Sequence, residues 1–318
     1  MSVFLPLQSM IGGVFIGTAC GIYMLVASRI AGNSGMLKSL ILGPRELTQA
    51  TFVAGLLGGG AVMASLLPSA FAAPPPPSLR LALSGLSVGL GVALGNGCTS
   101  GHGLCGLSRC SVRSLVAVPT FMAAAIATAT LLSGTGHAGF APFGTTPDSV
   151  LRLCQQLAGA LALALAPFAI LKKGSAEHEA YAGLWSGSCF AVGLSVGGMV
   201  RPSVVTGALS PALIDLTLWT LFVTALVVTF CFYRVGAHVL GVKAASAWDK
   251  QPSIDSQLLV GATLFGVGWG SSGVCPGPHL VALPAASFAA GPTLMLAFVG
   301  LGIKLSKPIA AAAFGGGF

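Results

Sequence analysis

Long apolar runs constrain this chain more than any other feature of its sequence. Crossing a bilayer takes roughly 17–25 mostly apolar residues. About nine stretches qualify, near 7–28, 48–68, 79–97, 113–132, 151–171, 181–199, 213–234, 256–274 and 283–302. Only 7% of the residues are charged, against roughly 25% in a typical soluble domain. We therefore predict an all-α integral membrane protein, with one transmembrane domain over residues 1–318 and re-entrant or broken segments between the helices.

The basic residues indicate topology rather than a nucleic-acid partner. The net charge is +8, but Lys and Arg stand singly at the ends of apolar runs, as topogenic charges do. With alternating spans, one side receives Arg29, Lys38, Arg45, Arg109, Arg113, Lys172, Lys173, Arg234, Lys243, Lys250, Lys304 and Lys307. The other side receives only Arg80, Arg152 and Arg201. We expect a multi-pass protein of the cell membrane (the inner membrane in a bacterium), with the N-terminus outside and the C-terminus cytoplasmic. The first apolar run is expected to be a retained helix.

An internal repeat relates residues 7–132 to residues 181–302, with 151–171 as a linking helix. Glycines precede two cysteines, Cys98 and Cys275, at the same offsets: Gly89, Gly91, Gly266 and Gly268. Corresponding helices are five spans apart, so the halves would insert in opposite directions. Inverted repeats place a substrate site near the membrane midplane, between discontinuous helices. The alternative is that glycine-rich helices resemble one another by chance.

Two glycine-rich interruptions carry the candidate chemistry. The first is GNGCTSGHGLCGLSR at 95–109, and the second is GSSGVCPGP at 270–278. Irregular backbone at membrane depth is tolerated where it is buried in protein or lines a water-filled cavity. The other interpretation of the first segment is a flexible turn outside the membrane. Two such loops, each with one cysteine and a helix break, favour two approaches to one path.

Cysteine thiols suit a soft anion. A protonated thiol is a weak donor with a polarizable sulfur, and it does not repel an anion. We predict that Cys98 and Cys275 line the path, together with Gly97, Thr99, Ser100, His102, Met199, Gly273 and Pro276. His102 either orients its loop or contacts the ligand. The remaining cysteines are expected to be packing residues: Cys20, Cys105, Cys110, Cys154, Cys189 and Cys231.

Three arginines flank the loop motifs, namely Arg29, Arg109 and Arg201. Most such arginines set topology, yet one of them could attract an anion to a vestibule. The five histidines show no metal-ligand spacing, and we predict no metal and no cofactor.

These motifs resemble the YeeE/YedE family of sulfur-transport membrane proteins. The resemblance rests on GNGCTSGHGLCGLSR and GVGWGSSGVCPGP, and also on SRIAGNSG and SVGGMVRPSVVTG, in this order along the chain. It implies thiosulfate uptake through a pseudo-symmetric helical fold, with the anion handed between thiols by S–H···S contacts. It also implies a small cytoplasmic sulfur-carrier protein as partner. Family members with a third path cysteine carry it where this chain has Gly198 and Met199.

Four classes of function compete. A transporter for thiosulfate or a closely related small sulfur-containing anion agrees with the repeat, the broken helices and the paired cysteines. A transporter or channel for another sulfur or selenium species uses the same features. A membrane thiol-redox enzyme would need a CxxC pair, or a quinone or haem site, that the sequence does not offer. A structural or assembly protein would need no glycine-rich interruptions, so we predict a non-enzymatic transporter.

Overall fold

The computed structural model describes residues 6–44, 46–132, 147–211, 215–239, 241 and 254–315. Arg45, Lys243 and Lys250, which entered the charge count, lie outside the described residues. The long helices are α1 (Pro6–Ala27), α3 (Leu47–Leu66), α4 (Leu79–Leu94), α5 (Val112–Leu132), α6 (Pro147–Leu163), α7 (Ala176–Val196), α9 (Thr217–Cys231), α11 (Ser256–Ser272) and α13 (Ala290–Phe314). The short segments between them are α2 (Asn33–Leu42), the π-helix η2 (Thr99–Gly106), α8 (Pro202–Leu209) and α12 (Pro276–Ala285). Single turns complete the fold: η1 (Pro68–Ala70), η4 (Ala166–Ala169), η5 (Phe232–Gly236) and α10 (Ala237–Val239).

Long apolar helices confirm the prediction of an all-α integral membrane protein. Seven helical stretches of the described chain are long and apolar enough to cross a bilayer. An eighth span results if α4 and η2, which meet at a bend of 42°, count as one. Helix α7 is 21 residues long, but it is not among these stretches. Most of its residues are buried against other helices, and small residues such as Gly and Ser suffice there. The count of nine spans therefore stays a prediction.

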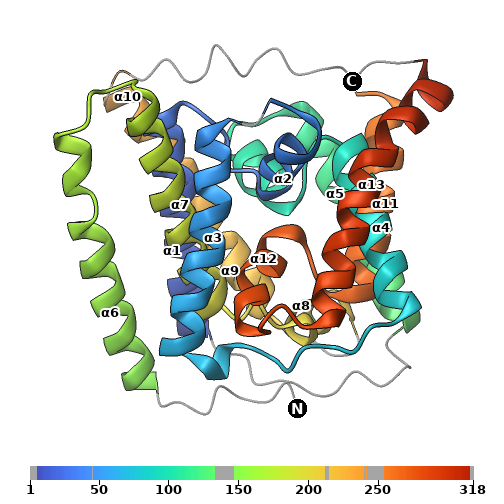
Figure 1. The fold of residues 1–318 in the computed structure, drawn as a ribbon, viewed down its shortest axis with the longest axis horizontal. Coiled ribbons are helices and arrows are strands. Elements are labelled where there is room, and N and C mark those ends of the chain that lie inside the picture. Colours follow the sequence, from blue (N-terminus) through green and yellow to red (C-terminus); the bar gives the residue numbers. More distant parts are fainter. Residues whose placement is uncertain are drawn as a thin grey trace.

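The long helices form two groups with the short segments between them (Figure 1). In one group α1 packs against α7, while α3 covers α7 and α9 covers α1. In the other group α4 packs against α11, while α13 covers α4 and α5 covers α11. Helix α6 stands at the outer edge beside α7. The short segments α2, α8 and α12 thus lie where both groups can surround them.

Packing partners correspond between the two halves of the chain. The first half of the chain can be matched to the second in order: α1, α2, α3, α4, η2 and α5 correspond to α7, α8, α9, α11, α12 and α13. Under this match the contact of α3 with α7 corresponds to the contact of α9 with α1. In the same way α13 on α4 becomes α5 on α11, and α12 on α3 becomes η2 on α9. Figure 1 draws α2 toward one end of the long helices and α8 and α12 toward the other. This order supports the predicted inverted repeat, which stays a prediction.

Glycine permits the close contacts between the central helices. A Cβ added to Gly12 on α1 would lie 2.6 Å from the Gly193 carbonyl oxygen on α7. A Cβ on Gly268 of α11 would lie 2.7 Å from the Ser84 carbonyl oxygen on α4. Small residues at such crossings let helix backbones approach, which is how membrane helices gain packing energy without a hydrophobic driving force.

The last predicted span is displaced from the observed helix. The sequence predicts 283–302, whereas α12 continues to Ala285 and α13 begins at Ala290. The chain turns between them at Ser287 and Phe288, whose φ angles are 48° and 54°. Serine and phenylalanine do not indicate a left-handed turn in a sequence. A prediction from hydropathy alone therefore merges the end of α12 with the start of α13 into one span.

Candidate functional site

The two predicted path cysteines stand at matching places in two short segments. Cys98 is the N-cap residue of η2, and Cys275 is the N-cap residue of α12. In neither case does the side chain accept a capping hydrogen bond. The N-terminal N–H groups of a helix have no partner within that helix, and such groups favour anions. At η2 the Cys98 thiol therefore stands beside donors suited to an anion, whereas the first turn of α12 offers only the Gly277 N–H, because Pro276 and Pro278 have none.

Local sequence explains both breaks. Helix α4 ends at Leu94, and Asn96 follows with φ 55°, a conformation that Asn tolerates better than most residues. Helix α11 ends at Ser272, and its C-cap residue Gly273 has φ 69°; an added Cβ there would also overlap the Pro202 carbonyl oxygen. Pro276 then occupies the first position of α12, where the missing N–H costs nothing.

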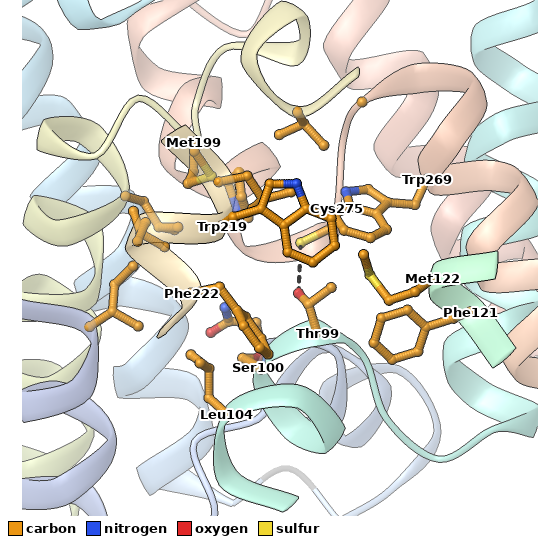
Figure 2. A pocket seen from close by; sticks show the side chains of 18 of the residues that line it. Thr99, Ser100, Leu104, Phe121, Met122, Met199, Trp219, Phe222, Trp269 and Cys275 are labelled. Atoms are coloured by element: carbon orange, nitrogen blue, oxygen red, sulfur yellow. Dashed lines mark hydrogen bonds between the residues drawn. The ribbon is translucent and has the colours of Figure 1, made fainter. Parts of the chain in front are cut away.

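Short segments and long helices together enclose a central cavity of about 110 Å³, several times the space that one water needs. Its polar edge consists of Asn33, Thr99, Ser100 and Cys275. The rest of the wall is largely apolar and aromatic, and includes Phe121, Met122, Met199, Trp219, Phe222 and Trp269 (Figure 2). No charged side chain of the described residues lines this cavity.

Hydrogen bonds connect the polar edge across three segments. Thr99 Oγ1 lies 3.7 Å from Cys275 Sγ, the contact drawn in Figure 2. Ser100 Oγ lies 3.3 Å from Cys98 Sγ and accepts a bond of 3.2 Å from the backbone N–H of Asn33. Cys275 therefore faces the central cavity directly, whereas the buried Cys98 contacts it through Ser100.

The other predicted loop residues separate into lining and supporting groups. Met199 and Gly273 line the central cavity, and Pro276 is buried at the start of α12. His102 is buried behind the cavity wall, with Nδ1 3.0 Å from Ser114 Oγ and Nε2 3.0 Å from the Gly95 carbonyl oxygen. Gly97 packs against the His102 ring, and a Cβ there would overlap it. These contacts favour the loop-orienting role for His102.

Among the three flanking arginines, Arg201 lines a cavity. Arg29 pairs with Glu46 and, at 3.5 Å, with Glu179. Arg109 donates from Nε to the Cys105 carbonyl oxygen at 3.0 Å. Arg201 is buried and donates to the carbonyl oxygens of Ser69 and Ala70.

Arg201 lines an open cavity of about 600 Å³, which we call the vestibule. It lies at the lower face in Figure 1, where α3 ends and α4 begins. Arg80 and several hydroxyl groups line it as well, namely those of Ser78, Ser84, Ser203, Thr206, Ser271 and Ser272. A small cavity of about 60 Å³ shares Pro202 and Val274 with the vestibule. The same small cavity shares Met199, Gly273 and Pro278 with the central cavity, so it adjoins both of the others.

Sequence reasoning missed Arg80 and Asn33. Arg80 counted only as one charge of a topology rule, although an arginine is also an anion ligand. Asn33 lies in SRIAGNSG, a motif that predicted a loop without saying which side chain turns inward.

Broken helices that surround a cavity between two groups of membrane-crossing helices define a membrane transporter, since discontinuous helices form the substrate sites of that class. The chain belongs to the sulphur transport family, which residues 6–127 match. Residues 180–309 match a second family, described as a family of unknown function (DUF6691). The membership confirms the resemblance to YeeE/YedE proteins. The two matches also divide the chain where the predicted repeat divides it.

Two curated relatives are similar to part of the chain. Each is described as a probable transporter of Xylella fastidiosa, one from strain Temecula1 and one from strain 9a5c. They are 39% and 38% identical to this chain over 125 residues, which is 38% of this chain and 91% of each relative. Together with the family, these relatives show that the chain is a sulfur-related membrane transporter.

Proposed function

We propose that this protein takes up thiosulfate, or a closely related small sulfur-containing anion, along a path lined by the thiols of Cys98 and Cys275. One observation carries the proposal. The two thiols come from opposite halves of the chain, stand before the first turns of two short segments, and approach one cavity, which Cys275 lines directly and Cys98 contacts through Ser100.

The chemistry of the central cavity favours a soft anion over a strongly hydrated one. Sulfate is strongly hydrated, and several charged donors would be needed to replace its hydration shell. No charged side chain of the described residues lines this cavity. Thiosulfate has a polarizable terminal sulfur, which a thiol and the Met199 thioether can contact without charge. The hydroxyl groups of Thr99 and Ser100 and the N-terminal N–H groups of η2 can donate hydrogen bonds to its oxygens. Contacts of this strength hold the anion briefly and release it.

The vestibule supports entry from the lower face. Arg80 and Arg201 raise the local concentration of anions, because a cleft lined by one sign of charge focuses its field. The anion then passes the small cavity and reaches Cys275. Handover between thiols by S–H···S contacts forms no covalent bond, so the process is transport and not an enzymatic reaction. A small sulfur-carrier protein at the cytoplasmic face would consume the delivered sulfur and maintain the gradient.

A second candidate is uptake of another soft sulfur or selenium species. Met199 favours it, because this thioether lines the cavity at the place where some family members have a third cysteine. A thioether accepts contacts but has no proton to donate. Substrate preference can therefore differ from that of a chain with three thiols.

Uptake of radiolabelled thiosulfate tests the proposal in cells that cannot use sulfate. We expect Cys275→Ser to lower uptake by about tenfold or more, because the hydroxyl lacks the soft contact. Serine is also a good N-cap residue, so the variant should keep its thermal midpoint or gain stability. Cys154→Ser is the matched control, because Cys154 is buried on α6 away from the central cavity. Full uptake by both Cys98→Ser and Cys275→Ser would refute the thiol path.

A further inference from the structure

Asn33 is a buried polar residue of the central cavity for which the fold gives no complete set of partners. It is the first residue of α2, is 2% exposed, and lines the cavity beside Ser100. Its side-chain Oδ1 has no hydrogen-bond partner among the described residues. Buried polar atoms are nearly always paired, so an exception on a cavity wall indicates an absent ligand or water.

The amide is held firmly in place. The backbone N–H of Asn33 donates to Ser100 Oγ at 3.2 Å, which ties α2 to η2. Its Nδ2 lies against Gly277, the second residue of α12, where an added Cβ would overlap the amide. The side chain therefore lies where three short segments meet, and the glycine makes room for it. An amide placed this way has little rotamer entropy left to lose on binding.

An amide can serve an anion in this position. Its oxygen and nitrogen exchange places by rotation of the amide plane, and at ordinary accuracy the two are assigned from their partners. With NH₂ turned toward the cavity, Asn33 donates hydrogen bonds and adds no charge. The Asn33 backbone bonds Ser100, and the adjacent Thr99 contacts Cys275, so the amide and the thiol belong to one polar edge. The edge thus offers both a soft contact and a hard donor.

We propose that the Asn33 side-chain amide donates a hydrogen bond to an oxygen of the transported anion while its sulfur end lies against Cys275. This inference rests on the proposed function and specifies which anions the site selects. An anion that has both a soft end and an oxygen-bearing end satisfies the whole polar edge. A hydrosulfide ion, which has no oxygen, leaves the amide unpaired, and that loss discriminates against it.

The test uses the full chain and thiosulfate as the probe, with initial uptake rates measured against concentration. We expect Asn33→Ala to raise KM by about tenfold or more, the effect of a lost hydrogen bond to a charged group, with little change in maximal rate. Asn33→Asp has the same shape but a negative charge, so it should abolish uptake. Ser34→Ala is the matched control, because Ser34 is the next residue of α2, is equally buried, and does not line the cavity.

Folded yield and thermal midpoint in detergent accompany each variant, so that misfolding is recognised. If Asn33→Ala misfolds, Asn33→Asp decides, because it keeps the size of the side chain and the backbone bond to Ser100. Wild-type KM in a folded Asn33→Ala protein, or normal uptake by Asn33→Asp, overturns the inference while the proposed function stands. An equal rise in KM for Ser34→Ala also overturns it. No thiosulfate uptake by the wild-type chain refutes the proposed function, and this inference with it.

Discussion

A histidine in a glycine-rich loop suggests ligand binding, yet both ring nitrogens of His102 already have protein partners. Ser114 belongs to α5 and the Gly95 carbonyl follows α4, so the imidazole connects the two ends of the loop. Gly97 lets the backbone lie directly on the ring. These contacts favour a role for His102 in positioning Cys98 and Thr99.

Removal of the imidazole should destabilise this loop. In His102→Ala the buried Ser114 hydroxyl loses its hydrogen-bond partner, and a buried group left unpaired costs about 1–3 kcal/mol. We expect a lower thermal midpoint in detergent, with uptake reduced in proportion to folded protein. His238→Ala is the control, because His238 is exposed on α10. A stable His102→Ala protein without uptake would instead assign the residue to the substrate path.

Cys98 and Cys275 differ in a way that their matching motifs do not indicate. Both follow a glycine pattern and precede a short segment, but only Cys275 lies on the cavity wall. The difference arises because Ser100 turns toward Cys98 and stands between its thiol and the cavity. One motif therefore defines the loop, and the packing around it defines the exposure of the thiol.

At the scale of elements, two glycines on α3 separate the effect of a close helix–helix contact from the effect of helix propensity. Gly60 is buried, and a Cβ there would overlap the Val281 carbonyl oxygen of α12. Gly58 is exposed one half-turn away, and nothing lies within 4 Å of its added Cβ. The same residue type thus has two roles on one helix.

Substitution by alanine should change the thermal stability in opposite directions at these two positions. Gly58→Ala gains helix propensity of up to about 1 kcal/mol, so its thermal midpoint should stay or rise. Gly60→Ala must displace α12, whose N-cap residue is Cys275, so both the midpoint and thiosulfate uptake should fall. Equal effects of the two substitutions would contradict the close contact between α3 and α12.

Short segments, rather than long helices, build the site. Asn33 of α2, Thr99 and Ser100 of the π-helix η2 and Cys275 at the N-cap of α12 supply the polar groups, while the long helices mainly supply apolar wall. This division is physical, because backbone that departs from a continuous helix must bury its polar groups in protein or direct them to a cavity. The long helices provide that burial.

At the scale of the whole molecule, charge and fold predict one orientation. Arg80 and Arg201 lie toward the lower face, whereas Arg29 and Arg109 follow elements that end at the opposite face. The positive-inside rule then places the vestibule outside the cell. Substrate would enter at the vestibule and leave on the cytoplasmic side.

Labelling by a membrane-impermeant maleimide tests this orientation. In a Cys231→Ser background we expect Ala73→Cys, exposed on the vestibule side, to react in intact cells. The native Cys110, exposed before α5, should react only in inverted vesicles. Cys110→Ser identifies the signal of that residue. The reverse pattern would place the vestibule in the cytoplasm and make the proposed uptake direction wrong.

The sequence by itself determined the class of the protein, the approximate spans and the places where two helices break. These are local properties, because hydropathy over about twenty residues and the backbone freedom of glycine and proline act within one segment. The motif resemblance likewise led to the correct family.

Only the tertiary structure decided which side chains meet. Asn33 and Ser100 are 67 positions apart, and Thr99 and Cys275 are 176 apart. No periodicity or motif specifies such pairs, because they depend on how two groups of helices enclose the short segments. For the same reason, Cys275 reaches the cavity while Cys98 stands behind Ser100, and an asparagine absent from the sequence-based site lines its wall.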